Sequence, residues 1–354
     1  MAHAEQRPTP EEIRAAQDDS PNLRARDLAD RLGISEAEPV AARVGDGATR
    51  LRAHPDHLMP AAETLGEVMA LTRVPACVHE KVGRYANYHP GPHASMVLNE
   101  EIDLRIFPKH WVHAYAVEAE GENGPRRSLQ VFDAAGDAVH KIHMRETSDH
   151  AAWAQVVSDL AHDDQSEGQA VEPRQPPEAP KSVPEKADVL RAEWRKLTDT
   201  HQFLRLCSKL KMNRLGAYRI AGAPFVRQLE PDAADLMLEA VRDAGIGVMV
   251  FVGNRGCIQI HSGPLQTVKA MGPWQNIMDP GFNLHLRRDK LAELWAVEKP
   301  TQRGPAISVE AFDVDGAIIF QVFGIGKEGM DSRPEWGRIV EALPGLPAVA
   351  PVGA

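Results

Sequence analysis

Residues 103–143 read DLRIFPKHWVHAYAVEAEGENGPRRSLQVFDAAGDAVHKIH, and residues 283–323 read NLHLRRDKLAELWAVEKPTQRGPAISVEAFDVDGAIIFQVF. A shift of 180 residues aligns the two segments without a gap, and 10 of the 41 aligned positions are identical. Background residue frequencies would give about two identities in a window of this length. The chain therefore contains an internal duplication, whose period is far longer than that of a solenoid repeat.

Each repeat shows the alternation of apolar and polar residues that predicts antiparallel strands. In the first repeat, residues 111–117 alternate, and Asp133-Ala-Ala-Gly136 predicts a turn between two such runs. The second repeat has the same pattern around Asp313-Val-Asp-Gly316. Upstream of these meanders, residues 11–45 and 187–222 carry apolar side chains at helical spacing. We therefore predict an α+β fold with a tandem duplication, in which each half is a helical segment followed by a large antiparallel β-sheet.

A segment rich in proline and charge separates the two halves. Residues 163–187 carry only two aliphatic side chains larger than alanine, Val171 and Val183. Such a stretch buries too little apolar surface to offset the entropy lost when it becomes ordered. We predict an N-terminal half over residues 1–162, a linker over 163–187, a C-terminal half over 188–345 and a loose tail over 346–354.

The composition is that of an acidic protein, with 354 residues, a net charge of -10 and a pI near 5.8. This balance argues against general binding to nucleic acid or anionic membranes. The longest nearly apolar run, residues 244–253, is about half the ~20 residues that a membrane span needs, and the N-terminus lacks an apolar leader. The cysteines, Cys77, Cys207 and Cys257, form no CxxC pair, which excludes a thiolate zinc site. We predict a cytoplasmic protein without membrane insertion.

One alternative is a DNA-binding regulator, because residues 27–36 resemble the first helix and turn of a helix-turn-helix reader. The second helix would then read EAEPVAAR over residues 36–43, which starts acidic, contains Pro39 and offers a single arginine. Attraction to phosphate dominates DNA affinity, so this helix would be a poor reader. We interpret the segment as a structural pair of helices and keep DNA binding as the remote alternative.

His201 lies in a series with Trp194, Leu197 and Leu204, at spacings of three, four and three residues. This spacing predicts a helix face that buries an imidazole beside an indole. Neutral imidazole is a good ligand for a transition metal or for haem iron, but a hydrogen-bonded core histidine fits the same pattern and is more common. Basic residues follow, which either favour the helix dipole or clamp an anion: Lys209, Lys211, Arg214 and Arg219.

Arg105 and Phe107 form a second candidate feature. They alternate with apolar Leu104 and Ile106, so on a strand they share one face with Asp103. Such a face fits ordinary half-solvated packing. It also fits a cover for a flat aromatic ligand, because guanidinium planes stack on rings.

Several segments together resemble one known family, and they span nearly the whole chain: IDLRIF (102–107), LTDTHQF (197–203), FVGNRGCIQIHSGP (251–264), GPWQN (272–276) and FNLHLR (282–287). They resemble the bacterial haemin-degrading factor family. Its members are cytoplasmic haem-transport and haem-utilisation proteins of Gram-negative iron-uptake systems. The resemblance implies two similar halves and haem b (haemin) held in a cleft between sheet and helices.

The resemblance also implies a set of haem contacts, carried over residue by residue. Some relatives also hold haem in the first half; His79 or His89 could serve there as the ligand of a second haem, and the sequence does not choose between them. The contacts in the matched positions are the proximal iron ligand His201, the distal Arg105 with its aromatic neighbour Phe107, the propionate-binding Arg214 and Lys299, and the pocket residue Gln321.

The function that this resemblance implies is a haem-binding protein of bacterial iron acquisition. It would accept imported haem from an ABC transporter and pass it to a haem oxygenase or another acceptor. The alternative is a haem-degrading enzyme that cleaves haem reductively, with Arg105 as its distal catalytic residue. Both roles require the same pocket, so the sequence leaves both open, and we place the carrier first. The oligomeric state also stays open.

Overall fold

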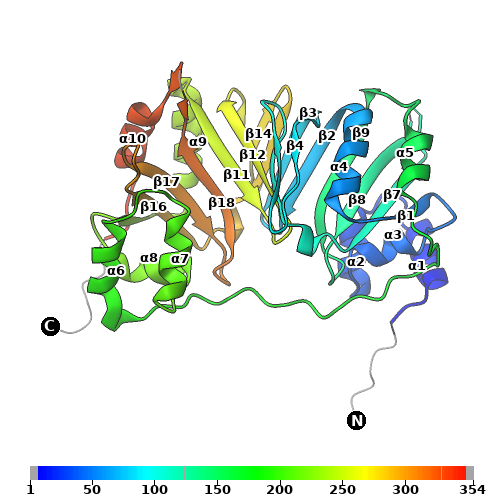
Figure 1. Ribbon diagram of the computed structural model, residues 1–354, viewed down its shortest axis with the longest axis horizontal. Coiled ribbons are helices and arrows are strands. Elements are labelled where there is room, and N and C mark those ends of the chain that lie inside the picture. Colours follow the sequence, from blue (N-terminus) through cyan, green and yellow to red (C-terminus); the bar gives the residue numbers. More distant parts are fainter. Residues whose placement is uncertain (1–6, 123, 328, 348–354) are drawn as a thin grey trace, which may run out of the picture. The chain divides into compact units, whose positions relative to one another are not determined.

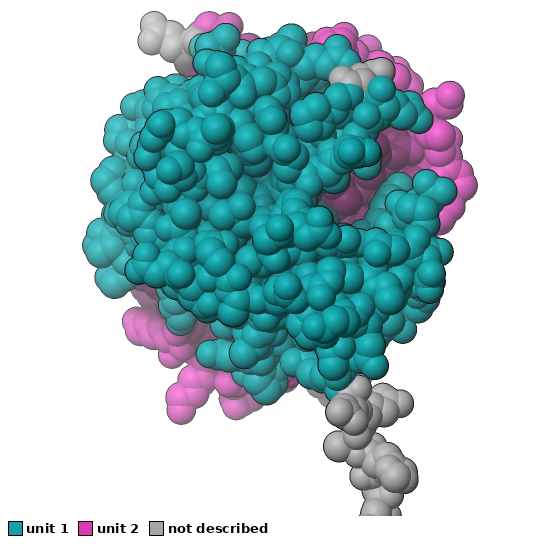
Figure 2. All heavy atoms as spheres, turned by 90° about the vertical axis from the view of Figure 1, so that its right-hand side faces the viewer, with its two compact units in different colours: residues 1–73, 80–175, 253–259 teal, residues 74–79, 176–252, 260–354 magenta. Residues whose placement is uncertain are grey.

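The computed structural model describes residues 7–122, 124–327 and 329–347 (Figure 1). The chain folds into two compact units, which Figure 2 colours separately. Unit 1 holds residues 1–73, 80–175 and 253–259, and unit 2 holds residues 74–79, 176–252 and 260–354. The short segments 74–79 and 253–259 occupy equivalent places in the repeat and belong to the opposite unit in each case. Each unit is therefore completed by a segment from the other half of the sequence.

The first half of the chain forms the elements α1 (Pro10–Asp18), α2 (Ala25–Leu32), α3 (Ala37–Ala41), β1 (Ala48–Leu51), α4 (Pro55–Thr64), β2 (Gly66–Val74), β3 (Cys77–Arg84), β4 (Tyr88–His89), β5 (Ser95–Leu98), β6 (Asp103–Ile106), η1 (Pro108–His110), β7 (His113–Ala119), β8 (Arg126–Phe132), β9 (Ala138–Ser148) and α5 (Trp153–Leu160).

The second half forms η2 (Pro184–Lys186), α6 (Ala187–Trp194), α7 (Gln202–Lys209), α8 (Arg214–Ala221), β10 (Val226–Leu229), α9 (Ala233–Ala244), β11 (Gly247–Gly253), β12 (Cys257–Pro264), β13 (Val268–Met271), β14 (Trp274–Asp279), β15 (Phe282–Arg287), η3 (Arg288–Lys290), β16 (Glu293–Lys299), β17 (Ala306–Phe312), β18 (Ile318–Gly324), β19 (Gly326–Lys327), β20 (Met330–Asp331) and α10 (Arg333–Ala342). Apart from the β19–β20 hairpin and η2, the order repeats that of the first half. The predicted α+β duplication is thereby confirmed.

Antiparallel sheets form the centre of both units. In unit 1 the strand order is β1-β7-β8-β9-β2, and in unit 2 the equivalent strands have the order β10-β16-β17-β18-β11. One face of the unit 2 sheet packs on α9 and α10 through side chains such as Val250 and Val309. The opposite face packs on α6, α7 and α8 through Trp295 and Phe312 (Figure 1). Unit 1 repeats this arrangement, with α4 and α5 on one face of its sheet and α3 on the other.

The two predicted turns are present and have the same construction. Asp313 accepts hydrogen bonds at Oδ1 from the backbone N–H groups of Asp315 and Ala317, at 3.0 and 2.9 Å. Gly316 has a φ of +84°, a left-handed conformation that favours glycine. In the first half, Asp133 binds the backbone of Ala135 and residue 137 in the same way, and Gly136 has a φ of +78°. The Asp-x-x-Gly pattern therefore fixes the β17–β18 connection locally.

Gly316→Ala is expected to lower the free energy of unfolding by about 1–3 kcal/mol, because of the left-handed backbone and because a Cβ there would lie 2.8 Å from the Pro180 ring. Gly337→Ala is the matched control, since it lies inside α10 and its Cβ would make only an ordinary 3.5 Å contact with Ile307. The control is expected to leave stability unchanged or to raise it by up to about 1 kcal/mol. Urea unfolding of both variants checks this; equal stabilities for the two would contradict it.

The helix-turn-helix resemblance does not produce a DNA-reading surface. Helix α3 has only five residues, and all of them are buried, including Glu38 and Pro39. A recognition helix must present its side chains to the bases of the major groove. The pair α2–α3 is therefore a structural element, as interpreted from its sequence.

The proline-rich segment is bound to the folded units although residues 163–183 form neither helix nor strand. In unit 1 the Arg50 guanidinium donates to the carbonyl groups of Ser166 and Gly168, at 3.0 and 2.8 Å. In unit 2 the backbone N–H of Lys181 donates to Asn213 Oδ1 at 2.9 Å. The division between the units falls at residues 175 and 176, within this segment. The domain boundaries given above stay a prediction, and residues 348–354 of the predicted tail lie outside the described residues.

Candidate functional site

His201 lies in unit 2, immediately before α7, and its side chain is 92% exposed. The prediction of a helix face that buries this imidazole was wrong. Helix α6 ends at Trp194, which is fully buried, whereas Leu204 in α7 is 51% exposed. Between α6 and α7, Asp199 binds the backbone N–H of His201, and short polar side chains compete in this way with helical hydrogen bonding.

The imidazole of His201 contacts the carboxylate of Asp199. Asp199 Oδ1 lies 2.7 Å from His201 Nδ1 and also accepts a 2.7 Å hydrogen bond from the backbone N–H of His201. These bonds, from the backbone and then from the ring, lower the pKa of Asp199. An ionised carboxylate can only accept a hydrogen bond, so in the neutral imidazole Nδ1 is the nitrogen that donates to Asp199 and Nε2 is the nitrogen with the lone pair. The exposed Nε2 is therefore prepared to act as a ligand.

A strip of half-exposed apolar side chains lies on the sheet of the same unit. Met249 and Phe251 in β11 and Phe323 in β18 form this apolar strip, and all three are of intermediate exposure. The Phe251 and Phe323 rings meet edge to face, with centroids 5.4 Å apart. The alternate residues of β11 are completely buried against the helices of the other face, so the strip is the accessible side of a rigid strand.

A buried ionic network, which we call the Glu310 network, connects α8 to the sheet. Glu310 in β17 is inaccessible to solvent. Its carboxylate accepts hydrogen bonds from Lys299 at 2.9 Å, Arg214 at 2.8 Å, the Tyr218 hydroxyl at 2.9 Å and the Ser308 hydroxyl at 2.8 Å. Lys299 also donates to the Tyr218 oxygen at 3.0 Å. Every partner of the carboxylate is thus a donor, as a buried charge requires.

The charges within this network are strongly coupled. Burial alone would raise the pKa of Glu310, but Lys299 and Arg214 outweigh it and hold that pKa well below its ordinary value. Burial lowers the pKa of Lys299, which Glu310 opposes. Two cations on one carboxylate leave a single net positive charge. The Lys299 side chain is 5% exposed, whereas the Arg214 side chain is 24% exposed, so Arg214 is the cation that reaches solvent.

Three predicted site residues therefore meet at one place. Arg214 and Lys299 bind Glu310 directly, and Gln321 lies opposite Glu310 in the β17–β18 register and opposite Phe251 in the β11–β18 register. Glu310 was not among the site residues predicted from the sequence. The only signal was a charged residue at an inward position of the strand ISVEAF, where the first half has Gln130.

Arg105 and Phe107 belong to unit 1. The Arg105 guanidinium pairs with Asp103 and donates to the carbonyl of Leu104 at 3.1 Å, and Leu104 and Ile106 are fully buried. The predicted alternation along β6 is confirmed. Phe107 follows β6 directly and is half-buried.

The two histidines considered for the first half lie in different surroundings. His79 belongs to unit 2, where it is fully buried and its ring centroid lies 5.0 Å from that of Phe282. His89 is exposed at the end of β4 in unit 1. A role for either as a haem ligand stays a prediction.

Unit 1 carries different chemistry on the equivalent part of its sheet. Lys141 and His143 occupy the positions equivalent to Gln321 and Phe323. Lys141 and Arg73 both pair with Glu36, whose side chain is 7% exposed. Burial lowers the pKa of His143 to about 4, so this imidazole is neutral at physiological pH. The two units thus share a fold and differ in the polarity of this surface.

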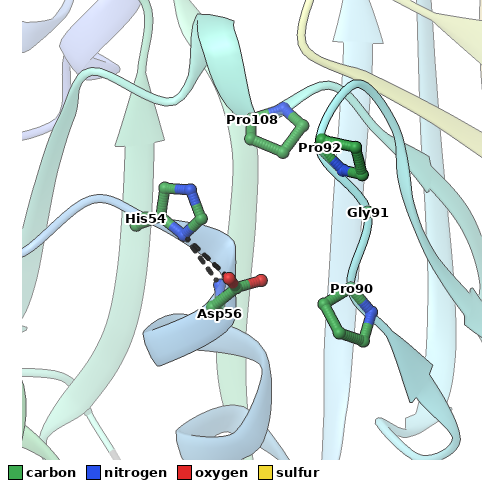
Figure 3. A pocket seen from close by; sticks show the side chains of 6 residues that line it. All are labelled: His54, Asp56, Pro90, Gly91, Pro92 and Pro108. Carbon is green, nitrogen blue, oxygen red and sulfur yellow. Dashed lines mark hydrogen bonds and ion pairs between the residues drawn. The ribbon is translucent and has the colours of Figure 1, made fainter.

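A cavity of about 400 Å³ in unit 1 contains none of the predicted site residues (Figure 3). It is lined by His54, Asp56, Pro90, Gly91, Pro92 and Pro108. The carboxylate of Asp56 already accepts a 2.5 Å hydrogen bond from the hydroxyl of Tyr88.

Among the described residues, no group of three His, Cys, Asp or Glu side chains is placed to hold a metal ion. Within the same ranges, no helix is long and apolar enough to cross a membrane.

Comparison with known proteins identifies the family. The haemin-degrading HemS/ChuX domain matches residues 33–160 and 211–343, which together make up more than half of the chain. The chain belongs to the haemin-degrading HemS/ChuX family. The resemblance found in the sequence is thereby confirmed, and the matched ranges fall in the two halves of the duplication.

Individual members of the HemS/ChuX family match along nearly the full chain. The hemin transport protein HmuS of Yersinia pestis is 38% identical over 329 residues, which cover 93% of this chain and 95% of HmuS. Holo-PhuS, a heme-binding protein from Pseudomonas aeruginosa, is 42% identical with a TM-score of 0.91, covering 96% of this chain and 100% of PhuS. ChuS, an E. coli heme oxygenase, is 33% identical with a TM-score of 0.83, covering 94% of this chain and 99% of ChuS.

Proposed function

We propose that this HemS/ChuX family protein binds haem through His201 in bacterial iron acquisition. The observation that carries the proposal is the almost fully exposed imidazole, whose Nδ1 lies 2.7 Å from Asp199 Oδ1, so that Nε2 is the ring nitrogen left to bind iron. The donor set in unit 2 fits the ligand: imidazole suits haem iron, the apolar strip suits a porphyrin face, and the Arg214 guanidinium suits a propionate. Haem, when bound, supplies redox-active iron; the chain supplies the ligand and the surface.

The relatives support haem as the ligand and leave two roles. One relative is named a hemin transport protein, one a heme-binding protein and one a heme oxygenase. We place the carrier first, because an iron ligand that is 92% exposed is accessible to an acceptor protein. We expect the donor to be a haem ABC transporter and the acceptor a haem oxygenase, in the cytoplasm. Reductive haem degradation by the protein itself is the alternative.

The two predicted propionate contacts, Arg214 and Lys299, differ in how far their side chains would have to rearrange. Arg214 reaches solvent while it is still paired with Glu310, so it can bind a propionate without rearrangement. Lys299 is buried and bound to Glu310 and Tyr218, so it must leave these partners to take the same role. Gln321 is predicted to line the pocket beside Phe251, its partner in register.

The role is tested by loading the protein with haemin, adding a reductant in air with catalase present, and then adding a haem oxygenase. A carrier is expected to keep its Soret band until the oxygenase is added. Decay of the band with release of iron before that point would favour the degrading enzyme. Absence of any saturable band would end the proposal itself.

Arg105→Ala is expected to change the ferric haem spectrum while it changes haemin affinity by less than about threefold. Arg105 is the predicted distal residue, and its guanidinium, which stays charged, would donate hydrogen bonds near the bound haem and so alter the spectrum more than the affinity. Absorption spectra and titrations of the variant check this, with Arg84→Ala, at the exposed end of β3, as the control. Identical spectra for the wild type and Arg105→Ala would count against a distal role.

A further inference from the structure

We propose that Asp199 is a positioning residue for His201, an inference that rests on the proposed function. Its carboxylate holds the imidazole with Nε2 available and strengthens that nitrogen as a donor to ferric iron. The juxtaposition is direct: one carboxylate oxygen lies 2.7 Å from Nδ1 and accepts a 2.7 Å hydrogen bond from the backbone N–H of the same residue. Two bonds to one residue fix both the backbone and the ring.

The turn that carries this pair is itself locked. Thr198 and Gln202 exchange two bonds of 3.0 Å, one from the Thr198 backbone N–H to the Gln202 side chain and one from the Gln202 amide to the Thr198 hydroxyl. The backbone N–H of Gln302 donates to the carbonyl of Thr198 at 3.0 Å, which connects the turn to the loop after β16. Asp199 therefore approaches His201 from a defined position, although both side chains are largely exposed.

The carboxylate changes what the imidazole can do. A free, exposed imidazole exchanges between two neutral tautomers, and only a nitrogen without a proton can bind a metal. A carboxylate acceptor at Nδ1 selects the tautomer with an unprotonated Nε2. Its negative charge also increases the basicity of the ligand, as second-shell carboxylates do for other metal-bound histidines. Greater donation favours the more highly charged ferric iron over ferrous iron.

A merely structural role for Asp199 makes a different prediction. Asparagine binds backbone N–H groups in such turns as well as aspartate does, so Asp199→Asn keeps the local structure and removes only the charge. Asp188→Asn is the matched control, because it removes one charge from neighbouring α6 at a residue that is 99% exposed and pairs with Arg191. A structural role leaves both variants with wild-type ligand properties.

The experiment measures the His201 tautomer in the full-length apo-protein by ¹⁵N NMR and the midpoint potential of the haem complex. Asp199→Asn is expected to populate both tautomers and to lower the affinity for ferric relative to ferrous haem by about tenfold, which raises the potential by about 59 mV. Asp188→Asn is expected to match the wild type in both measurements.

Two failures can be told apart. If haem binds and Asp199→Asn keeps the wild-type tautomer and potential, the positioning role is overturned and the proposed function stands. If the wild-type protein binds no haem, the proposed function fails and the inference fails with it.

Discussion

His201→Ala is expected to lower the affinity of the apo-protein for haemin by about 100-fold, or about 2.7 kcal/mol, and to change the absorption spectrum of what remains bound. The substitution removes the exposed nitrogen that is proposed to bind iron. Stability should change by less than about 0.5 kcal/mol, because a side chain that is 92% exposed contributes little to the core. Haemin titrations followed by absorbance, together with urea unfolding, measure both quantities.

His57→Ala is the control for this substitution, since His57 is an exposed histidine in α4 of unit 1. It is expected to bind haemin like the wild type. Unchanged affinity and an unchanged spectrum for His201→Ala would remove His201 as the axial ligand. Equal losses in both variants would show that the effect comes from surface histidines in general.

Glu310→Gln is expected to lower the free energy of unfolding by about 3 kcal/mol, since it leaves the buried Lys299 and the partly buried Arg214 without a counter-charge. The pKa of Glu310 in the folded protein lies below its ordinary value of 4.5. The ionised carboxylate therefore stabilises the fold at neutral pH, and this contribution falls as the pH drops below about 4.5. Urea unfolding at pH 7 and at pH 4 measures both effects.

The first half of the chain provides the matched control for this substitution. Gln130 and Ala119 occupy the positions equivalent to Glu310 and Lys299. The double variant Glu310→Gln/Lys299→Ala recreates that pair and removes the buried ammonium, so it is expected to be more stable than Glu310→Gln alone. A single variant that loses less than about 1 kcal/mol, or a double variant that loses more than the single one, would contradict the proposed energetics of the Glu310 network.

The duplication, the α+β class and the Asp-x-x-Gly turns could be predicted because they depend on local patterns. Alternation with period two and a glycine at a left-handed position are visible in one sequence. The helices α4, α5, α9 and α10 were not predicted, although strands such as β17, in which residues 308–312 are all buried, require a cover on both faces. Burial of both faces depends on tertiary packing and is not visible from alternation alone.

Most residues of the candidate site could be named from the sequence, but their burial and their contacts with one another could not. His201 was expected to be buried, because the spacing of Trp194 and Leu197 suggested one continuous helix, whereas α6 ends at Trp194 and Asp199 binds the backbone of the turn that follows. Arg214 and Lys299 were predicted to bind the haem propionates, and the structure shows that the Glu310 carboxylate already binds both side chains. Such pairings join residues about 100 positions apart or lie across a strand register, so no local pattern reveals them.

A haemin titration of the apo-protein, followed at the Soret band, is the direct test of haem binding through His201. We expect a saturable band near one equivalent of haemin per chain, which is weakened and altered in His201→Ala. No saturable band, or a band that is identical in the wild type and His201→Ala, would contradict it.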